Sequence, residues 1–376
     1  MYNEVIKIIE GGIAMDRRKV LGYAALLADN LQKKGDVKFA DRIRNLMVNT
    51  NLSHASLDAF GTKPVDSESH LDIVDISYPT LTDSDFVLDS CVKDMVEDFK
   101  LGYEKREELM RVGVRDFNSL LLYGPSGCGK TSVATLIASR LGLPLVVARL
   151  DTLISSLLGS TAKNIRRVFE YASRRRGVLF LDEFDAIAKM RNDKNELGEL
   201  KRVVNGLLQE MDMFSEQSVL IAATNHHELL DPAIWRRFGI VYQLGLPDEA
   251  TIGRLLLRFV NGNGDAKLQD PRVLRRLSAA LVGCSHSGIQ TIVQNALKET
   301  VLSGRKKIEY CDILRSAYVF LNHKVDDNCF IEFLLSHKVA TRDIFGRYGY
   351  PVRKVREISK RVRSAAKRRK EVRHGA

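Results

Sequence analysis

Residues 124–131 read Gly-Pro-Ser-Gly-Cys-Gly-Lys-Thr and follow directly after an apolar run at residues 120–123. This is the G-x-x-x-x-G-K-[ST] spacing, in which glycines let backbone N–H groups close around phosphate oxygens. Lys130 supplies a positive charge for the β- and γ-phosphates, and the hydroxyl of Thr131 suits Mg²⁺. Helical spacing over residues 132–140 directs a helix N-terminus at the same phosphates. The pattern predicts a site for a nucleoside triphosphate.

Polar residues also follow two later apolar runs, each with the composition of a buried strand in a parallel sheet. Residues 178–181 end at Asp182 and Glu183, and residues 219–223 lead to Asn225. In an open α/β sheet such ends share one edge, where ligands bind. In P-loop enzymes the acid holds Mg²⁺ and a neighbouring glutamate polarises the attacking water. The pattern favours hydrolysis over nucleotide binding alone, and solvated strand ends are the alternative.

Five motifs together resemble those of the AAA ATPases in the narrow sense, and they occur in that family's order. They are the segments 124–131, 181–185, 199–212, 223–225 and 230–238. An ABC ATPase would carry an LSGGQ-like signature and a GTPase an N-K-x-D base-reading motif, and the sequence has neither. The full pattern looks most like small single-ring bacterial AAA proteins that are often encoded beside a subtilisin-like protease.

The resemblance implies an α/β fold, a P-loop AAA+ module in which a parallel αβα sheet carries a small helical lid. Apolar residues at helical spacing add an N-terminal helical domain and a C-terminal, basic helical extension. The expected parts are an N-terminal hairpin or bundle at 1–50, a linker at 51–84, the large ATPase subdomain at 85–246, the lid at 247–318 and the extension at 319–376.

The resemblance also implies roles for individual side chains, with ATP and Mg²⁺ as cofactors. The expected ATP-binding residues are Gly124, Pro125, Ser126, Gly127, Cys128, Gly129, Lys130, Thr131, Ser132, His286 and Ser287. Thr131 and Asp182 match Mg²⁺ ligands, Glu183 matches the general base, and Asn225 matches the sensor that orients the lytic water. The His-Ser pair at 286 and 287 replaces the Gly-Ala pair that members usually hold against adenine and ribose.

Arg236 and Arg237 match the family's arginine fingers, which reach into the nucleotide of a neighbouring subunit. A guanidinium suits the spread negative charge of a transferring phosphoryl group. The resemblance therefore implies a homo-oligomeric ring, with a hexamer expected, whereas the residues alone also fit a solvated helix end. The family's first pore loop corresponds to residues 155–159, where Leu157 replaces the aromatic residue of many members.

A basic segment ends the sequence. Residues 353–376 hold eleven Lys or Arg and two Glu, a net charge of +9 against +11 for the whole chain. Residues 340–358 look like a helix-turn-helix with Gly349 at the turn, although Phe345 replaces the small residue normally needed where the helices cross. Its expected core positions are Ile344, Tyr348, Tyr350, Val355 and Ile358. Such a unit suits salt-sensitive contacts with nucleic acid, and a solvated helix packing on a neighbour or an acidic partner is the alternative.

Two function classes follow. The first, implied by the resemblance, is an oligomeric ATP-driven remodeller or regulator of a protein client. In this class the protein works with a separate subtilisin-like protease in defence against phage or plasmids. The second is a DNA-associated ATPase switch that uses the C-terminal unit. The sequence has no H-E-x-x-H motif and therefore no zinc protease of its own.

Composition limits where the protein acts. No apolar run approaches the roughly 18 residues of a membrane span, and the N-terminus lacks the basic-then-apolar design of a signal peptide. The five cysteines are odd in number and scattered, and Cys128 lies inside the phosphate loop. We expect reduced thiols, no membrane partner and a cytoplasmic location.

Overall fold

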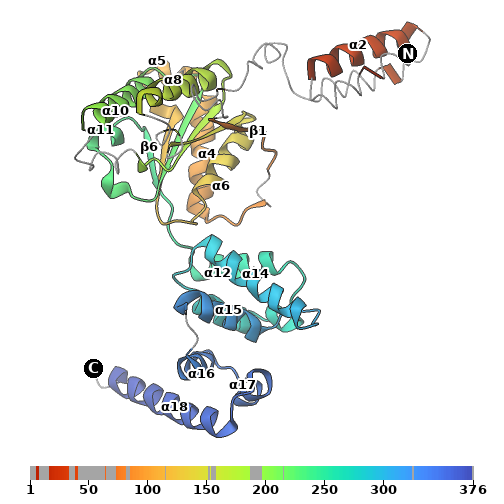
Figure 1. Cartoon of the computed structure of the whole chain (residues 1–376), viewed down its shortest axis with the longest axis vertical. Coiled ribbons are helices and arrows are strands. Elements are labelled where there is room, and N and C mark those ends of the chain that lie inside the picture. Colours follow the sequence, from red (N-terminus) through yellow and green to blue (C-terminus); the bar gives the residue numbers. More distant parts are fainter. Residues whose placement is uncertain are drawn as a thin grey trace. The chain divides into compact units, whose positions relative to one another are not determined.

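The computed structural model describes most of the chain from residue 73 onward and short parts before it (Figure 1). The described residues are 6–7, 17–33, 39–40, 64, 73–81, 85–114, 116–150, 153, 158–186, 197–214, 216–323 and 326–374. The chain divides into two compact units, Met1–Pro64 and Val65–Ala376. In the first, helix α2 (Arg17–Lys33) buries Ala28 and Leu31. The rest of the predicted hairpin and most of the predicted linker lie outside the described residues.

A six-stranded sheet lies within the second unit, in the order β1-β3-β4-β5-β2-β6. Its strands are β1 (Asp75–Ser77), β2 (Ser119–Tyr123), β3 (Leu145–Arg149), β4 (Val178–Asp182), β5 (Val219–Thr224) and β6 (Ile240–Gln243). β1 is antiparallel to β3, and the other neighbours are parallel. The register sets Arg149 opposite Asp182 and Tyr123 opposite Thr224. The carboxyl ends of β2, β3, β4 and β5 therefore share one edge.

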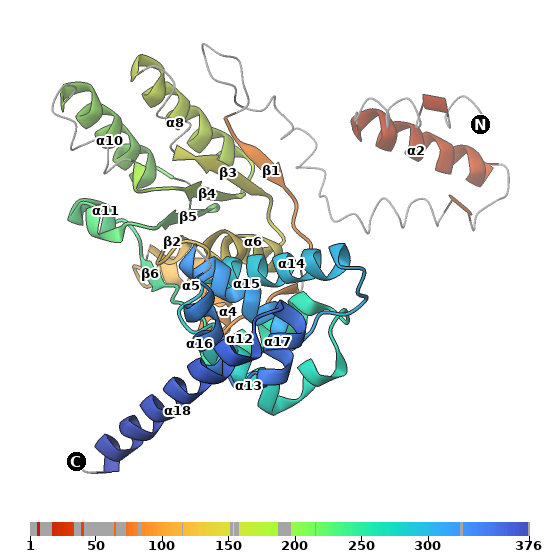
Figure 2. The same ribbon diagram turned by 60° about the horizontal axis from the view of Figure 1, so that its bottom comes forward.

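Helices cover both faces of this sheet (Figure 2). They are α4 (Ser90–Glu104) and α6 (Lys130–Leu141) on one face, and α8 (Leu158–Arg174) and α10 (Leu197–Asp212) on the other. Successive strand residues point to opposite faces, so Leu120 packs with α4 and α6 whereas Leu121 packs with α8 and α10. β4 and β5 are apolar up to their last residues, Asp182 and Thr224, because helices cover both of their faces. The predicted αβα arrangement is confirmed.

Four helices follow the sheet and form the lid. They are α12 (Glu249–Val260), α13 (Pro271–Ala280), α14 (His286–Leu302) and α15 (Tyr310–Asn322). Asp248, Asp270 and Ser285 begin the first three helices by accepting hydrogen bonds from backbone N–H groups of the first turn. Such caps satisfy donors that the helix itself leaves unpaired. The Ser285 cap fixes where α14, which contacts the phosphate loop, begins.

Three further helices continue from the lid: α16 (Asp327–Ser336), α17 (Thr341–Tyr348) and α18 (Val352–His374). Ile344, Val355 and Ile358 are buried in the same apolar core as lid residues, so these helices extend the lid core. Phe345 is 44% exposed and lies outside that core, so it does not occupy the helix crossing assigned to it from the sequence. Across the described ranges, no helix is both long and apolar enough to cross a membrane.

Candidate nucleotide-binding site

The phosphate loop joins β2 to α6 and depends on glycine at close approaches. Gly124, Gly127 and Gly129 all have positive φ angles, of 143°, 74° and 94°. A Cβ on Gly124 would lie 2.0 Å from the backbone oxygen of Leu244, and one on Gly127 would lie 1.9 Å from Oγ of Ser287. Real Cβ atoms do not approach that closely, and L side chains rarely adopt these φ angles. The glycine spacing therefore shapes the loop in this chain.

Lys130 lies at the centre of the loop and is only 8% exposed. Its Nζ donates hydrogen bonds to the carbonyl oxygens of Gly124 and Pro125, at 2.8 and 3.0 Å, and to Oδ1 of Asn225 at 2.7 Å. Burial lowers the pKa of Lys130, and the nearby carboxylate of Asp182 acts in the opposite direction. The Lys130 ammonium thus connects the phosphate loop to Asn225, the residue that follows β5. A phosphate bound in the loop would contact both residues.

Two predicted Mg²⁺ ligands lie side by side. Thr131 Oγ1 donates a hydrogen bond to Oδ2 of Asp182 at 3.3 Å, and the N–H of Glu183 donates to Oδ1 at 2.9 Å. A hydroxyl and a carboxylate are hard oxygen donors of the kind that Mg²⁺ prefers, and Mg²⁺ usually adds phosphate oxygens and waters to one or two such groups. The residues present fit the ion.

Glu183 has the left-handed backbone angle φ 54° directly after β4. This conformation is costly for a non-glycine residue and clusters at functional sites. Its carboxylate is about half exposed, with Oε1 3.9 Å from the NH2 group of Arg149 at the end of β3. The sequence did not single out Arg149, because only the parallel register brings the ends of β3 and β4 together.

The end of β5 is held by a buried acid. Asp185 is 3% exposed, and its Oδ1 accepts hydrogen bonds from Thr224 Oγ1 at 3.2 Å and from the N–H of Asn225 at 3.5 Å. Thr224 Oγ1 in turn accepts from the N–H of His226 at 3.1 Å. These bonds fix the backbone that carries the Asn225 amide toward Lys130.

The lid meets the phosphate loop at the first residues of α14. The N–H of Ser287 donates to the carbonyl of Gly127 at 3.1 Å. His286 is more than half buried, and burial lowers its pKa while Asp89 acts in the opposite direction. Its Nδ1 is buried without a hydrogen-bond partner among the described residues, so this ring nitrogen suits a polar group of a nucleotide.

These elements line one cavity of about 540 Å³, a volume in the range of small-molecule sites. Predicted residues in its lining are Ser126, Gly127, Cys128, Gly129, Lys130, Thr131, Ser132, Asp182, Glu183, Asn225, His286 and Ser287. Gly124 and Pro125 contribute carbonyl acceptors to Lys130 instead. Residues missed from the sequence, among them Phe86, Val87, Leu88, Leu244, Arg258 and Phe259, also line it. Most of these are apolar, as a base pocket requires.

The two predicted arginine fingers are not in this lining. They follow the short helix α11 (Pro232–Trp235). Arg237 Nε and NH2 donate to the two carboxylate oxygens of Asp212 at 2.8 and 2.9 Å, and NH1 donates to the carbonyl of Ala233 at 2.7 Å. The Arg236 side chain is exposed and makes no hydrogen bond or ion pair with any residue that the structure describes. Leu157 of the predicted pore loop lies outside the described residues.

An aromatic cluster connects the phosphate loop to α11. The ring of His227 lies 4.6 Å from Tyr123, the last residue of β2, and 6.3 Å from Trp235. Tyr123 and Trp235 meet edge to face at 5.6 Å. The cluster therefore couples the strand that leads into the loop to the residue just before Arg236. The fold and the cavity together define a P-loop nucleotide site.

Comparisons with known proteins identify the family to which this P-loop protein belongs. The pattern of the family described as "ATPase family associated with various cellular activities (AAA)" matches residues 120–246. An uncharacterized AAA family ATPase, y4kL of Sinorhizobium fredii (strain NBRC 101917 / NGR234), is 40% identical over 250 residues, covering 66% of this chain and 74% of that protein. The chain belongs to the AAA family, and it is an ATPase.

More distant relatives match over the same region. A proteasome-activating nucleotidase of Saccharolobus islandicus (strain Y.N.15.51 / Yellowstone #2) is 30% identical over 61% of this chain and 59% of its own length. One from Methanococcus maripaludis (strain C7 / ATCC BAA-1331) is 33% identical over 54% of this chain and 52% of its own length. The chain thus spans little more than half of these two relatives.

A solved structure shares the fold. The crystal structure of the FIGL-1 AAA domain in complex with ADP matches with a TM-score of 0.57 at 19% sequence identity, covering 77% of this chain and 98% of that one. At this identity the likeness shows the AAA fold alone.

Proposed function

We propose that the protein assembles into a homo-oligomeric ring, a hexamer, and uses ATP hydrolysis to remodel a protein client. One observation carries the proposal. The cavity holds groups for binding and for hydrolysis, yet neither predicted arginine finger lines it. A finger arginine that acts in this cavity then comes from a second copy, which makes assembly a condition of turnover. Relatives named as proteasome-activating nucleotidases support an action on other proteins.

Within the cavity, the proposed chemistry follows from the contacts. Thr131 and Asp182 would hold Mg²⁺, which would supply charge neutralisation for the phosphates. Lys130 contacts the same phosphates, and Asn225, held by its bond to Lys130, orients the attacking water. Glu183 accepts the proton of that water. His286 and Ser287 contact the base or ribose from the lid.

Of the two arginines, Arg236 is the proposed finger. Arg237 is committed to Asp212 and Ala233 of its own chain, and these bonds hold the segment after α11. Arg236 is exposed directly beside it, so its guanidinium is available to a neighbouring subunit. An arginine supplied to the γ-phosphate is worth about 10³ to 10⁵ in rate. Arg237 then acts as the residue that positions Arg236.

A mixing experiment tests the shared site. Arg236→Ala and Lys130→Ala should each be inactive alone, the first lacking the finger and the second the phosphate contact. Mixed in equal amounts, they should recover part of the activity, because some interfaces then pair an intact cavity with an intact arginine. No recovery, in mixtures that sedimentation shows to co-assemble, would overturn the shared site.

The proposal extends to the wider setting of the protein. We infer a separate partner protease of the subtilisin type, supported by the resemblance to AAA proteins encoded beside such proteases, and a role in defence against phage or plasmids. A cytoplasmic location is supported by five free cysteines, three of them buried. Co-purification of Glu183→Gln with ATP, which should hold partners in the bound state, tests the protease. Recovery of no protease would contradict it.

A second candidate function, an ATPase switch on nucleic acid, is favoured by the exposed basic side chains of α18.

A further inference from the structure

We propose that α18 binds duplex nucleic acid along its sugar-phosphate backbone through a single row of basic residues. The proposal rests on the second candidate function and names its interface. It does not depend on remodelling of a protein client.

The row, here called the basic stripe, begins with Arg353, Arg356 and Lys360. The three are spaced by three and four residues, so they share one face of the helix, and all are exposed. None of these three side chains has a hydrogen bond or ion pair with a described residue. The sequence continues the same spacing along α18 with Arg363, Lys367 and Lys370. Because a helix rises about 1.5 Å per residue, the six positions span about 25 Å.

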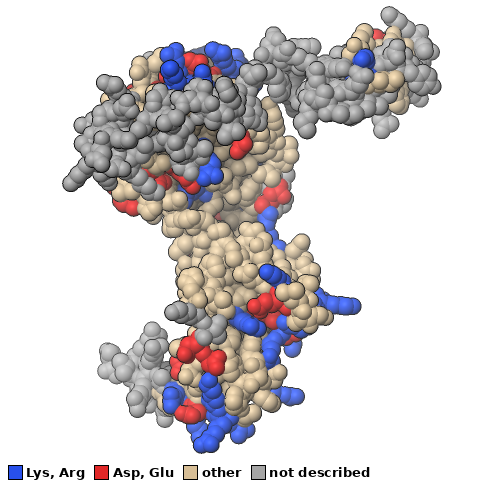
Figure 3. All heavy atoms as spheres, viewed as in Figure 1, with Lys and Arg blue, Asp and Glu red and all other residues tan. Residues whose placement is uncertain are grey.

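Two basic residues in the described half of α18, Lys354 and Arg361, lie outside the stripe and are paired with carboxylates. Lys354 Nζ lies 3.2 Å from Oδ2 of Asp327, and Arg361 NH2 lies 2.7 Å from Oε1 of Glu357. Figure 3 shows Lys and Arg side chains gathered near the start of α18. In the described half of α18 the unpaired basic side chains are therefore those of the stripe, whose regular spacing matches a polyanion with closely and regularly spaced charges. Duplex DNA carries one negative charge per about 1.7 Å of its axis.

The opposite side of α18 is already packed. Val355 and Ile358 are 1% and 5% exposed and share a core with Ile344 of α17 and Phe330 of α16. A helix that lies on a membrane surface needs a free apolar face to insert. The apolar face of the described half of α18 is already packed against α16 and α17, so it is not free to insert. Gly349, with φ 71°, ends α17 and allows the short turn into α18. Helix, turn and helix thus hold Arg353, Arg356 and Lys360 on the solvent side, as in helix-turn-helix proteins.

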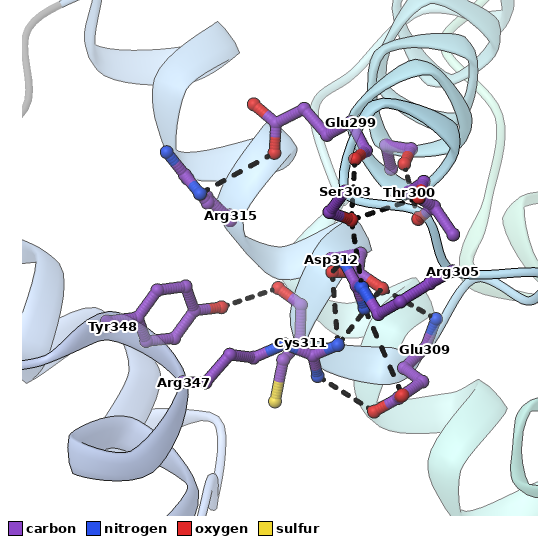
Figure 4. A network of polar contacts seen from close by, with 11 residues as sticks. Glu299, Thr300, Ser303, Arg305, Glu309, Cys311, Asp312, Arg315, Arg347 and Tyr348 are labelled. Carbon is purple, nitrogen blue, oxygen red and sulfur yellow. Dashed lines mark hydrogen bonds and ion pairs between the residues drawn. The ribbon is translucent and has the colours of Figure 1, made fainter.

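Polar contacts fix this unit to the lid (Figure 4). Arg347 of α17 reaches Oε2 of Glu309 at 2.8 Å and Oδ1 of Asp312 at 3.3 Å. The same Asp312 side chain, 6% exposed, also receives Arg305 at 2.9 Å. Tyr348 OH donates to the carbonyl of Cys311 at 2.9 Å. The stripe is therefore presented by a fixed support, which lowers the entropy cost of aligning it with phosphates.

The composition of the stripe sets the mode of binding. It contains only Lys and Arg, and the contacts proposed for them are with phosphates, which carry no sequence information directly. Unrelated duplex sequences should therefore bind with equal affinity. With about six phosphates neutralised, the slope of log affinity against log salt is about −5.4. Affinity then falls about 2,000-fold between about 50 and 200 mM salt.

The test uses the full chain without nucleotide and a fluorescent DNA duplex of about 20 base pairs, with anisotropy read across that salt range. Arg356→Gln/Lys360→Gln removes two stripe charges and should reduce the fall to about 150-fold. The matched control, Lys354→Gln/Arg361→Gln, removes two charges from the same helix and should keep the original slope. ATP turnover should be unchanged in both, since none of these residues lines the cavity.

Three results would overturn the proposal: no shift of the duplex at about 50 mM salt, equal slope changes in the two double variants, or a strong preference for one duplex sequence. Binding to phosphatidylserine vesicles with none to DNA would also do so and would assign the stripe to membranes. ATP-driven remodelling would survive all of these results, because its test is the mixing of active-site variants.

Discussion

Arg236 and Arg237 are adjacent, yet their surroundings predict opposite consequences of substitution. Arg237→Ala removes a two-pronged ion pair with Asp212 and a bond to Ala233. Charge-assisted bonds are worth about 1.5–3 kcal/mol each when buried, but the Arg237 side chain is 28% and the Asp212 side chain 52% exposed. Solvent screening reduces the sum to about 1–2 kcal/mol. The melting temperature should fall by roughly 1.5–3 °C, given the size of the unit Val65–Ala376.

Arg236→Ala should leave stability within about 0.5 kcal/mol, because an exposed side chain without a partner contributes little to folding. Its turnover should instead fall about 10³-fold. Differential scanning fluorimetry and a coupled phosphate-release assay, run well below both melting temperatures, separate the two effects. A stable Arg237→Ala without activity, beside a fully active Arg236→Ala, would reverse the assignment of the finger.

Three further outcomes follow from single contacts. Gly124→Ala should lose nucleotide affinity and about 1–3 kcal/mol of stability, because the new Cβ would meet a backbone oxygen at a positive φ angle. The control, Gly206→Ala in α10, has open space for its Cβ, and its free energy of unfolding in chemical denaturation should rise by up to about 1 kcal/mol. Because burial lowers the pKa of His286, the unfolded chain binds the proton more readily. The free energy of unfolding should therefore fall as pH drops below about 6.5, and less steeply in His286→Asn. Arg347→Ala should cost about 1–2 kcal/mol, since Asp312 keeps Arg305, and hydrogen exchange should rise in α16 to α18 while the sheet is unchanged.

Much of the site could be predicted because its chemistry requires particular residues at short spacing. A phosphate-binding loop needs glycines within one turn and a lysine beside them, so the sequence alone predicts the loop at residues 124–131. The runs ending at Asp182 and Asn225 were readable because strands covered on both faces must be apolar. Once three parallel strands were inferred, the meeting of their ends at one edge followed from the topology.

The remainder depends on which distant segments pack together, and no local pattern encodes that. Arg237, in the turn after α11, contacts Asp212, the last residue of α10. The apolar side of the cavity combines residues before α4 with others from α12. Phe345 was misassigned because a template position describes an average helix crossing, whereas in this chain the side chain points out of the core. Such partners emerge only from the folded arrangement.

The central claim is that ATP bound in this cavity is hydrolysed with Glu183 as the base. Glu183→Gln tests it most directly, since the amide keeps the shape of the side chain but accepts no proton. ATP affinity, measured by filter binding with Mg²⁺, should stay within about threefold of the unaltered protein, while turnover should fall at least about 10²-fold. Undiminished turnover would contradict the account, and so would a loss of turnover explained entirely by lost binding.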